Sequence, residues 1–204
     1  MNKHKRYSPL GNYVAGPAGN FLELGTPVFQ ARFALGDRAP LQGSRVVSEN
    51  VQPCFEMRLE RPPIEILTAI FALFRAVMRI SATVFESGPC SRALAQQEAL
   101  VWLVYGHKAG WSLRVPPQIA AADHVHSIPI TAEDRVGIVF HSHGRLPAYF
   151  SPIDDRDEVD GFIYGVVGEL HQHRPSVLLR AGYAGHFLPL ALEDVFMKGK
   201  NSNG

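Results

Sequence analysis

Cysteine is scarce in this sequence, and neither sign of charge dominates it. The 204 residues include only 2 cysteines, Cys54 and Cys90, which are too few for a disulfide framework or a cysteine-rich zinc site. We therefore expect two buried thiols in a reducing compartment. The formal net charge of +1 gives no electrostatic reason to expect nucleic acid or an anionic membrane as a partner.

A long uninterrupted apolar run is also missing. The most apolar stretch, residues 64–80, contains Glu65, Arg75 and Arg79, and these charges make it unfit to span a bilayer. The basic start, residues 1–6, is not followed by the apolar segment of a signal peptide. With 46% hydrophobic and 19% charged residues, the chain has an ordinary globular composition, and we expect it to be soluble and cytoplasmic.

Glycine, proline and the apolar pattern divide the chain into three regions. Residues 1–62 are rich in glycine and proline and contain short apolar pieces, which predicts a β-rich accessory region. Residues 63–196 combine a long amphipathic helical pattern with several short β-branched runs, which predicts an α/β domain with a mixed sheet. Residues 197–204 are small and polar, which predicts a disordered tail.

One stretch of the second region carries a candidate for chemistry. A short apolar run beginning at Val136 reads as a buried strand, and it ends in His-Ser-His. Side chains alternate along a strand, so His141 and His143 are expected to point the same way, close enough to converge on one ion. After seven intervening residues, Ser151 begins Ser-Pro-Ile-Asp, a typical helix start. If this start folds back, Asp154 completes the open N, N, O ligand set of a catalytic zinc site.

Each half of this pattern also has a common structural interpretation. A His-x-His at a strand end is more often a surface or core pair, and Ser-Pro-x-Asp is an ordinary capping box. A second His-x-His at residues 124–126, with Thr131 and Asp134 behind it, has a gap of four residues instead of seven and no long apolar strand before it. We expect that segment to be a loop followed by a helix or turn start. The joint occurrence of both halves at the longer spacing favours a metal site.

Together these residues resemble the signature of the JAMM (JAB/MPN-type) metalloprotease family, a glutamate well upstream followed by H-[ST]-H-x7-S-x2-D. The resemblance covers about residues 64–196. It implies that His141, His143 and Asp154 bind Zn²⁺ and that Ser151 helps to stabilise a tetrahedral intermediate. It also implies a mixed curved sheet flanked by helices, with layering like that of cytidine deaminases.

The resemblance also suggests the general base. JAMM-like proteins place the catalytic glutamate before a strand that ends in glycine, and residues 100–105 form such a strand. Glu98 stands just before it and is the expected base, with Glu86 as the alternative. The chain departs from the family at Trp102, where glycine is frequent, and at Gly144, where proline is common. The glycine predicts a less rigid loop after the histidines.

The resemblance implies cleavage of peptide or isopeptide bonds after the C-terminal tail of a ubiquitin-like protein. The accessory region beside such a domain further resembles a component of bacterial PRTRC cassettes, which are associated with a ThiF-like activating enzyme and a ubiquitin-like protein. The main alternative is an inactive interaction scaffold on the same fold, although such relatives usually lack a ligand and this chain retains the full set. A zinc deaminase would need H-x-E with P-C-x-x-C, and neither occurs here. Peptidase activity on other substrates stays open.

Overall fold

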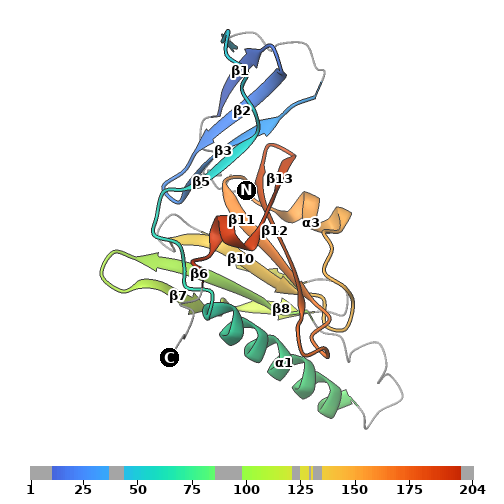
Figure 1. The fold of residues 1–204 in the computed structure, drawn as a ribbon. Helices are drawn as coiled ribbons and strands as arrows, with labels where there is room; N and C mark the ends of the chain where they lie inside the picture. The colour runs from blue at the N-terminus through green and yellow to red at the C-terminus, as the bar shows by residue number, and fades with distance from the viewer. Residues whose placement is uncertain are drawn as a thin grey trace, which may run out of the picture.

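The computed structural model describes residues 11–36, 44–85, 98–120, 125–128, 130 and 135–198. Within them the chain is a mixed α/β protein whose two larger sheets are mostly antiparallel (Figure 1). The central sheet has six strands in the order β13-β12-β11-β10-β6-β7, and only β10 and β11 run parallel. Its strands are β6 (Leu100–Gly106), β7 (Gly110–Arg114), β10 (Val136–Ser142), β11 (Phe162–Gly168), β12 (Ser176–Tyr183) and β13 (His186–Leu190).

Strand alternation gives the central sheet two different faces. On β10, Ile138 and Phe140 face the main hydrophobic core, whereas Val139 belongs to a smaller apolar cluster on the other side. All seven residues of β10 are buried, as expected for a strand covered on both faces. His141 follows the same alternation and lies on the side of Val139, away from the main core. The central strand therefore delivers its first histidine to the smaller face.

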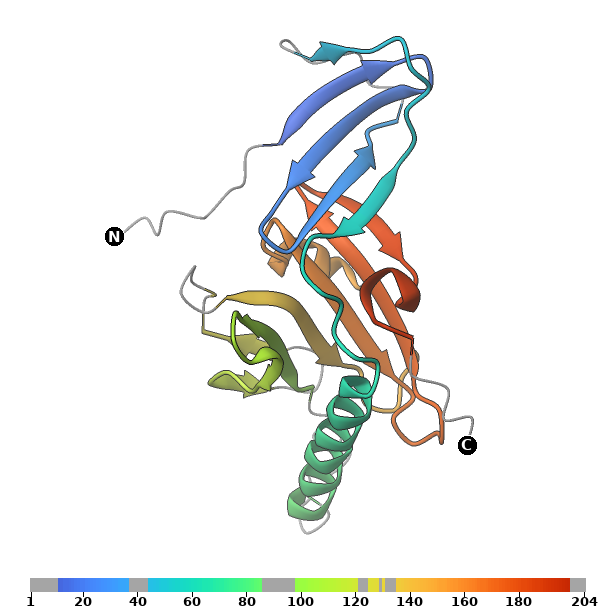
Figure 2. The ribbon, with the colours of Figure 1, turned by 60° about the vertical axis from the view of Figure 1, so that its left-hand side comes forward.

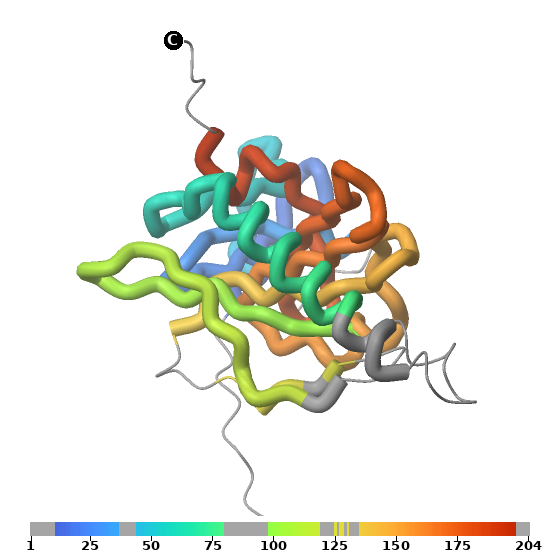
Figure 3. The backbone as a smooth tube through the Cα atoms, turned by 90° about the horizontal axis from the view of Figure 1, so that it is seen from below, coloured from blue at the N-terminus to red at the C-terminus, as the bar shows by residue number. Residues whose placement is uncertain are grey.

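The main core is closed by α1 (Ile66–Phe85), which runs across the sheet when the molecule is seen from below (Figure 3). Its apolar residues recur at helical spacing, and Leu67, Ile70 and Phe74 are buried in the core cluster. The predicted helix is thus confirmed, and it continues a few residues past the Ser81 region where the apolar pattern weakens. Because α1 covers one face, a site open to solvent can form only on the other.

The N-terminal region folds as a five-stranded sheet in the order β4-β1-β2-β3-β5, which confirms its predicted β-rich character. This sheet lies at the opposite end of the molecule from α1 (Figure 1; Figure 2 from a second direction). It does not have a core of its own: Leu22, Phe29 and Phe33 belong to the same buried cluster as Phe140. Its strands are β1 (Asn12–Gly16), β2 (Gly19–Gly25), β3 (Phe29–Ala34), β4 (Arg45–Val46) and β5 (Cys54–Met57).

Cys54, on β5, is exposed, so the expectation of a buried thiol is wrong for this residue. It lies on the outer strand of the N-terminal sheet, where alternate residues face solvent. Cys90 lies outside the described residues. The 197–204 tail is described only through residue 198.

Several short elements complete the described chain. They are β8 (Gln118–Ala120), β9 (Val125–Ser127), α3 (Pro152–Asp157) and α4 (Leu192–Val195). β8 and β9 pair as a two-stranded sheet, so part of the segment expected to be a loop around the second His-x-His is a strand. The three residues of β9 form a strand because they pair with β8, and nothing in their own sequence predicts this pairing. Among the described residues, no helix is long and apolar enough to cross a membrane.

Candidate metal centre

The C-terminal end of β10 supplies two imidazoles. His141 is the penultimate residue of the strand, and His143 follows its last residue. Both side chains are buried, and their Nε2 atoms lie 3.1 Å apart. The parallel neighbour β11 holds the second histidine through a hydrogen bond from the His143 backbone N–H to the Val167 carbonyl, 2.8 Å long. The predicted convergence of the two histidines is confirmed.

The third candidate ligand comes from the first turn of α3. Ser151 is the N-cap, Pro152 opens the helix, and the capping box is formed as the sequence predicts. The Asp154 backbone N–H donates to Ser151 Oγ at 3.3 Å, and the Ser151 backbone N–H donates to Asp154 Oδ2 at 2.6 Å. The cap occupies one carboxylate oxygen and fixes the rotamer, which leaves Oδ1 to face the histidines.

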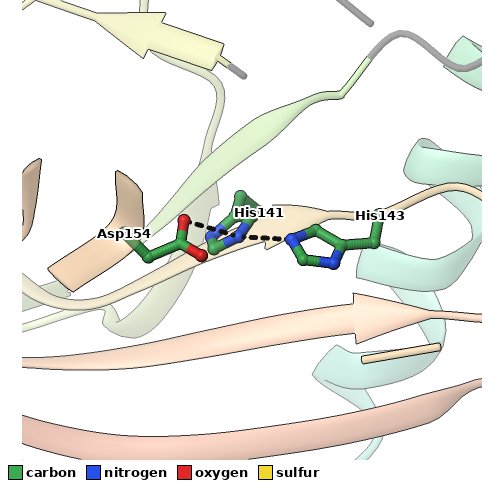
Figure 4. Close-up of side chains that lie close together, drawn as sticks. All are labelled: His141, His143 and Asp154. Carbon is green, nitrogen blue, oxygen red and sulfur yellow. Dashed lines mark hydrogen bonds and ion pairs between the residues drawn. The ribbon is translucent and has the colours of Figure 1, made fainter. Parts of the chain in front are cut away.

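The three side chains meet at one point (Figure 4). Asp154 Oδ1 lies 3.2 Å from His141 Nε2, and the three potential ligand atoms lie within 4.8 Å of one another. Atoms bound at about 2.0–2.2 Å from one zinc ion would be separated by distances of this order. His141, His143 and Asp154 can therefore hold a metal ion, with two nitrogens and one oxygen as ligands.

Burial keeps both imidazoles in the form that binds metal. It lowers the pKa of His141 to about 4, against the opposing effect of the Asp154 carboxylate and with smaller lowering effects from His143 and Arg180. Burial also lowers the pKa of His143, while Asp154 and a hydrogen bond with the Pro147 backbone act in the opposite direction. A neutral imidazole is the ligand form of histidine. The site is thus prepared for a cation at neutral pH.

The loop after the histidines is firmly held, contrary to the expectation raised by Gly144. Gly144 has φ +58, a conformation closed to proline, and its carbonyl accepts from the Leu170 backbone N–H at 2.9 Å. The Leu146 carbonyl accepts from the Glu169 backbone N–H at 2.7 Å. The loop passes so close to Gly168 that a Cβ there would lie 2.2 Å from a backbone atom of the loop. Glycine therefore permits a tight turn that backbone hydrogen bonds then lock.

Glu98 reaches the same site from the neighbouring strand. Its Oε1 lies 3.9 Å from His143 Nε2, and its side chain is largely buried. Ser142, the residue between the two histidines, faces the other way and secures this approach: its Oγ accepts from the Ala99 backbone N–H at 3.0 Å, and its own N–H donates to the Ala99 carbonyl at 2.9 Å. The structure thus brings the predicted base to the predicted ligands, through an anchor that sequence reasoning missed.

A pocket of about 610 Å³ contains the metal cluster together with Glu98 and Ser151. Its floor is a row across three neighbouring strands, in which Val139 pairs with Trp102 on one side and with Tyr164 on the other. The Tyr149 ring stands edge-on to His143, with centroids 4.4 Å apart. The site is therefore polar where the metal ligands meet and apolar on the floor beside them.

The rim of the pocket exposes large apolar side chains. Ile128, Leu146, Tyr149 and Val159 all line it, and each is between 41% and 46% exposed. Large exposed apolar side chains gathered around a polar centre are typical of a surface that binds another molecule. Neither the apolar rim nor Tyr149 belongs to the sequence pattern, because these residues are brought together only by the fold.

Three other residues of the sequence analysis do not enter the described site. Glu86, the alternative base, and His124, from the second His-x-His, lie outside the described residues. His126 lies in β9, but its side chain is not described. Among the residues that the structure does describe, the metal-binding cluster is the one formed by His141, His143 and Asp154.

The fold and site define a mixed α/β protein with a candidate metal centre beside a partly apolar pocket. No family model and no curated protein matches the chain. The motif and the geometry of the centre are therefore the grounds for assigning a function.

Proposed function

We propose that the chain is a cytoplasmic zinc-dependent hydrolase of the JAMM type that cleaves peptide or isopeptide bonds. The observation that carries this proposal is the convergence of His141, His143 and Asp154 on one point, at the spacing of the H-S-H-x7-S-x2-D pattern. A sheet with α1 on one face and the site on the other is compatible with JAB/MPN-like layering.

The donor set suits zinc better than the other common metals. Two imidazoles and one carboxylate leave a fourth position for solvent in a tetrahedral site, whereas Ca²⁺ and Mg²⁺ prefer sets made of oxygen. When bound, a zinc ion would lower the pKa of a water molecule to about 7 and polarise the scissile carbonyl. That is the chemistry required to attack an amide at neutral pH.

Two further residues would act on protons and on developing charge. Glu98, on the His143 side of the cluster, would accept a proton from the attacking water and pass it to the leaving amine. The Ser151 hydroxyl lines the same pocket and would donate a hydrogen bond to the oxyanion. Ser151 Oγ accepts from Asp154 in the cap, and this leaves its hydrogen available to donate.

The substrate class follows from the resemblance and is compatible with the pocket. An apolar rim around a hydrolytic centre would favour a protein segment over a small polar metabolite. JAMM-like proteins act on ubiquitin-like tails, so we propose a ubiquitin-like protein or its conjugates as substrate. The resemblance to protein A of bacterial PRTRC cassettes adds a ThiF-like activating enzyme as a possible partner.

The rival function is an inactive interaction scaffold on the same fold. It predicts the same apolar rim but no bound metal and no turnover. The complete ligand set and the approach of Glu98 to His143 favour the enzyme, because a scaffold has no need to bury two neutral imidazoles beside a carboxylate.

The test is metal analysis of the purified full chain combined with cleavage of ubiquitin-like fusion proteins. We expect about one zinc per chain and turnover that a chelator abolishes and zinc restores. Asp154→Ala should lose the zinc, whereas Glu98→Gln and Ser151→Ala should keep it, the second with a rate lowered roughly 10²–10³-fold. His173→Ala, at an exposed histidine, is the control that should match the unmodified protein. Absence of stoichiometric metal in the unmodified chain would favour the scaffold.

A further inference from the structure

The helix that carries the aspartate ligand has little to hold it in place by itself. α3 has six residues and none of them is buried. Helices this short are unstable without tertiary contacts. The helix also carries three negative charges, on Asp154, Asp155 and Asp157. Only the two in the first turn interact favourably with the positive end of the helix dipole. Its position over β10 must therefore be set by groups outside the helix.

One buried cation contacts both ends of this helix. Arg180, on the central part of β12, is 7% exposed. Its Nη2 lies 2.8 Å from Asp155 Oδ1 in the first turn and 2.9 Å from Oε1 of Glu158, the C-cap. Its Nε donates to both carboxylate oxygens of Glu158, at 3.0 and 3.2 Å. The Nη2 contacts are ion pairs and the hydrogen bonds run from Nε to Glu158; a lysine ammonium cannot reproduce this planar fork of nitrogens.

The guanidinium is also fixed on its two faces. Its Cζ lies 3.8 Å from the ring centroid of Phe150 and 3.8 Å from that of Phe187. Phe150 immediately precedes the Ser151 N-cap, and Phe187 lies on β13. The cation is thus held by the hairpin of β12 and β13 and holds the chain on both sides of α3.

We propose that Arg180 is a positioning residue for the metal centre: by holding both ends of α3 against β12, it sets the place of Asp154 opposite the two histidines. It does not touch the metal position itself. This inference rests on the metal binding proposed above, and it names the part of the fold that determines how tightly the ion is held.

Positioning and simple electrostatics predict opposite results, which makes the inference testable. Arg180 is a buried positive charge paired with Asp155, the residue next to Asp154, so it also repels a cation at the site. If charge were its main influence, removal of Arg180 would tighten metal binding. If it holds α3, removal loosens the Asp154 ligand and weakens binding, even though a repulsive charge has gone.

The experiment measures Co²⁺ and Zn²⁺ affinity and the visible spectrum of bound Co²⁺ in the full-length protein. Arg180→Lys keeps the charge and loses the fork and the stacking. The double variant Arg180→Met, Glu158→Gln removes one charge of each sign, so it leaves no buried carboxylate unpaired and little change in net field. We expect both to raise the Kd for metal roughly 10- to 100-fold, the range typical of residues that orient metal ligands, and to alter the Co²⁺ spectrum.

Two further variants keep the result decisive. Arg75→Lys changes an arginine that joins α1 to the Leu170 and Gln172 carbonyls, away from α3, and should leave the Kd within about twofold of the unmodified value. Phe187→Leu, at a partly exposed position, removes one of the two rings that stack on Arg180 and should raise the Kd for metal several-fold. This milder variant decides the question if the Arg180 variants do not fold.

The outcomes separate the two proposals. Unchanged or tighter metal binding in the folded Arg180 variants, or in Phe187→Leu if those do not fold, overturns the role of Arg180 and leaves the hydrolase proposal standing. An unmodified protein that binds neither metal overturns both.

Discussion

Ser142→Ala tests whether the residue between the two histidines positions the general base. Its hydroxyl is on the core side of β10, and Oγ accepts from the buried Ala99 N–H at 3.0 Å. Alanine removes that acceptor and leaves the N–H unsatisfied. The reciprocal bond from the Ser142 N–H to the Ala99 carbonyl is retained, so the strand pairing survives while the segment beside Glu98 is loosened.

The magnitude follows from the burial of both partners. Ser142 is 1% exposed and Ala99 is 4% exposed, so water cannot replace the lost acceptor. An unsatisfied buried donor costs about 1–3 kcal/mol in the free energy of unfolding. For a domain of this size, each kcal/mol corresponds to a fall of about 2–4 °C in Tm. We expect turnover to fall roughly 10- to 100-fold, a free-energy change of similar size, because a shift of the base by about 1 Å can cost up to about 100-fold in rate.

The assay compares urea unfolding, zinc content and cleavage of a ubiquitin-like fusion in the same preparations. Ser142→Ala should keep its zinc, because the three ligand side chains are untouched. Ser142→Thr, which retains a hydroxyl, should recover most of the activity. Thr26→Val is the control: it removes a buried hydroxyl, in the turn between β2 and β3 and outside the pocket, that accepts from the Phe29 N–H at 3.0 Å, and it should lose stability without losing turnover. Full turnover in a destabilised Ser142→Ala protein would refute the positioning role, and so would loss of its zinc.

Two further predictions concern the charge state of the site and its rim. In metal-free Glu158→Gln, the free energy of unfolding should be highest above about pH 6.5 and fall by up to about 3 kcal/mol as the pH drops towards 4, because burial lowers the pKa of His141 to about 4. The unmodified protein should show a shallower slope. Burial raises the pKa of Glu158 to about 7, so the stabilisation from protonated Glu158 is lost as the pH rises through 7 and opposes the effect of His141. Urea unfolding across this pH range checks both slopes, and a flat profile in Glu158→Gln would contradict the assignment. Leu146→Ser should raise KM up to roughly 10-fold with zinc content unchanged, because it removes a leucine from the pocket rim. Leu178→Ser, at an equally exposed leucine outside the pocket, is the control and should leave KM unchanged. Equal KM values for the two variants in a steady-state assay would show that the rim does not contact the substrate.

The local sequence was sufficient to predict the three candidate ligands, because strand alternation and helix capping depend only on residues a few positions apart. The alternation of a strand places His141 and His143 on one side, and the capping box fixes the rotamer of Asp154 whatever the rest of the chain does. The same rules predicted α1 and the strands β6, β7, β10, β11 and β12, but not β8 or β9. They did not predict β13 or α4, whose short and mixed sequences have no strong period, or the pairing of β9 with β8.

The approach of Glu98 could be expected only through a resemblance, because it depends on which strands pair. Leu100 faces His141 in the antiparallel register of β6 and β10, and this pairing brings the preceding glutamate to the histidines. Nothing in the sequence around residue 98 specifies that register. The loop after His143 shows the converse: a glycine that suggested looseness is locked by hydrogen bonds to a distant turn.

By itself, the sequence identified the candidate metal ligands and the local geometry of the two short segments that carry them, since strand alternation and helix capping act within a few residues. Only the tertiary structure decided that these segments face each other, that Glu98 joins them, and that Arg180 and an apolar rim surround them. Those relations depend on strand order, register and burial, which are properties of contacts between residues far apart in the chain.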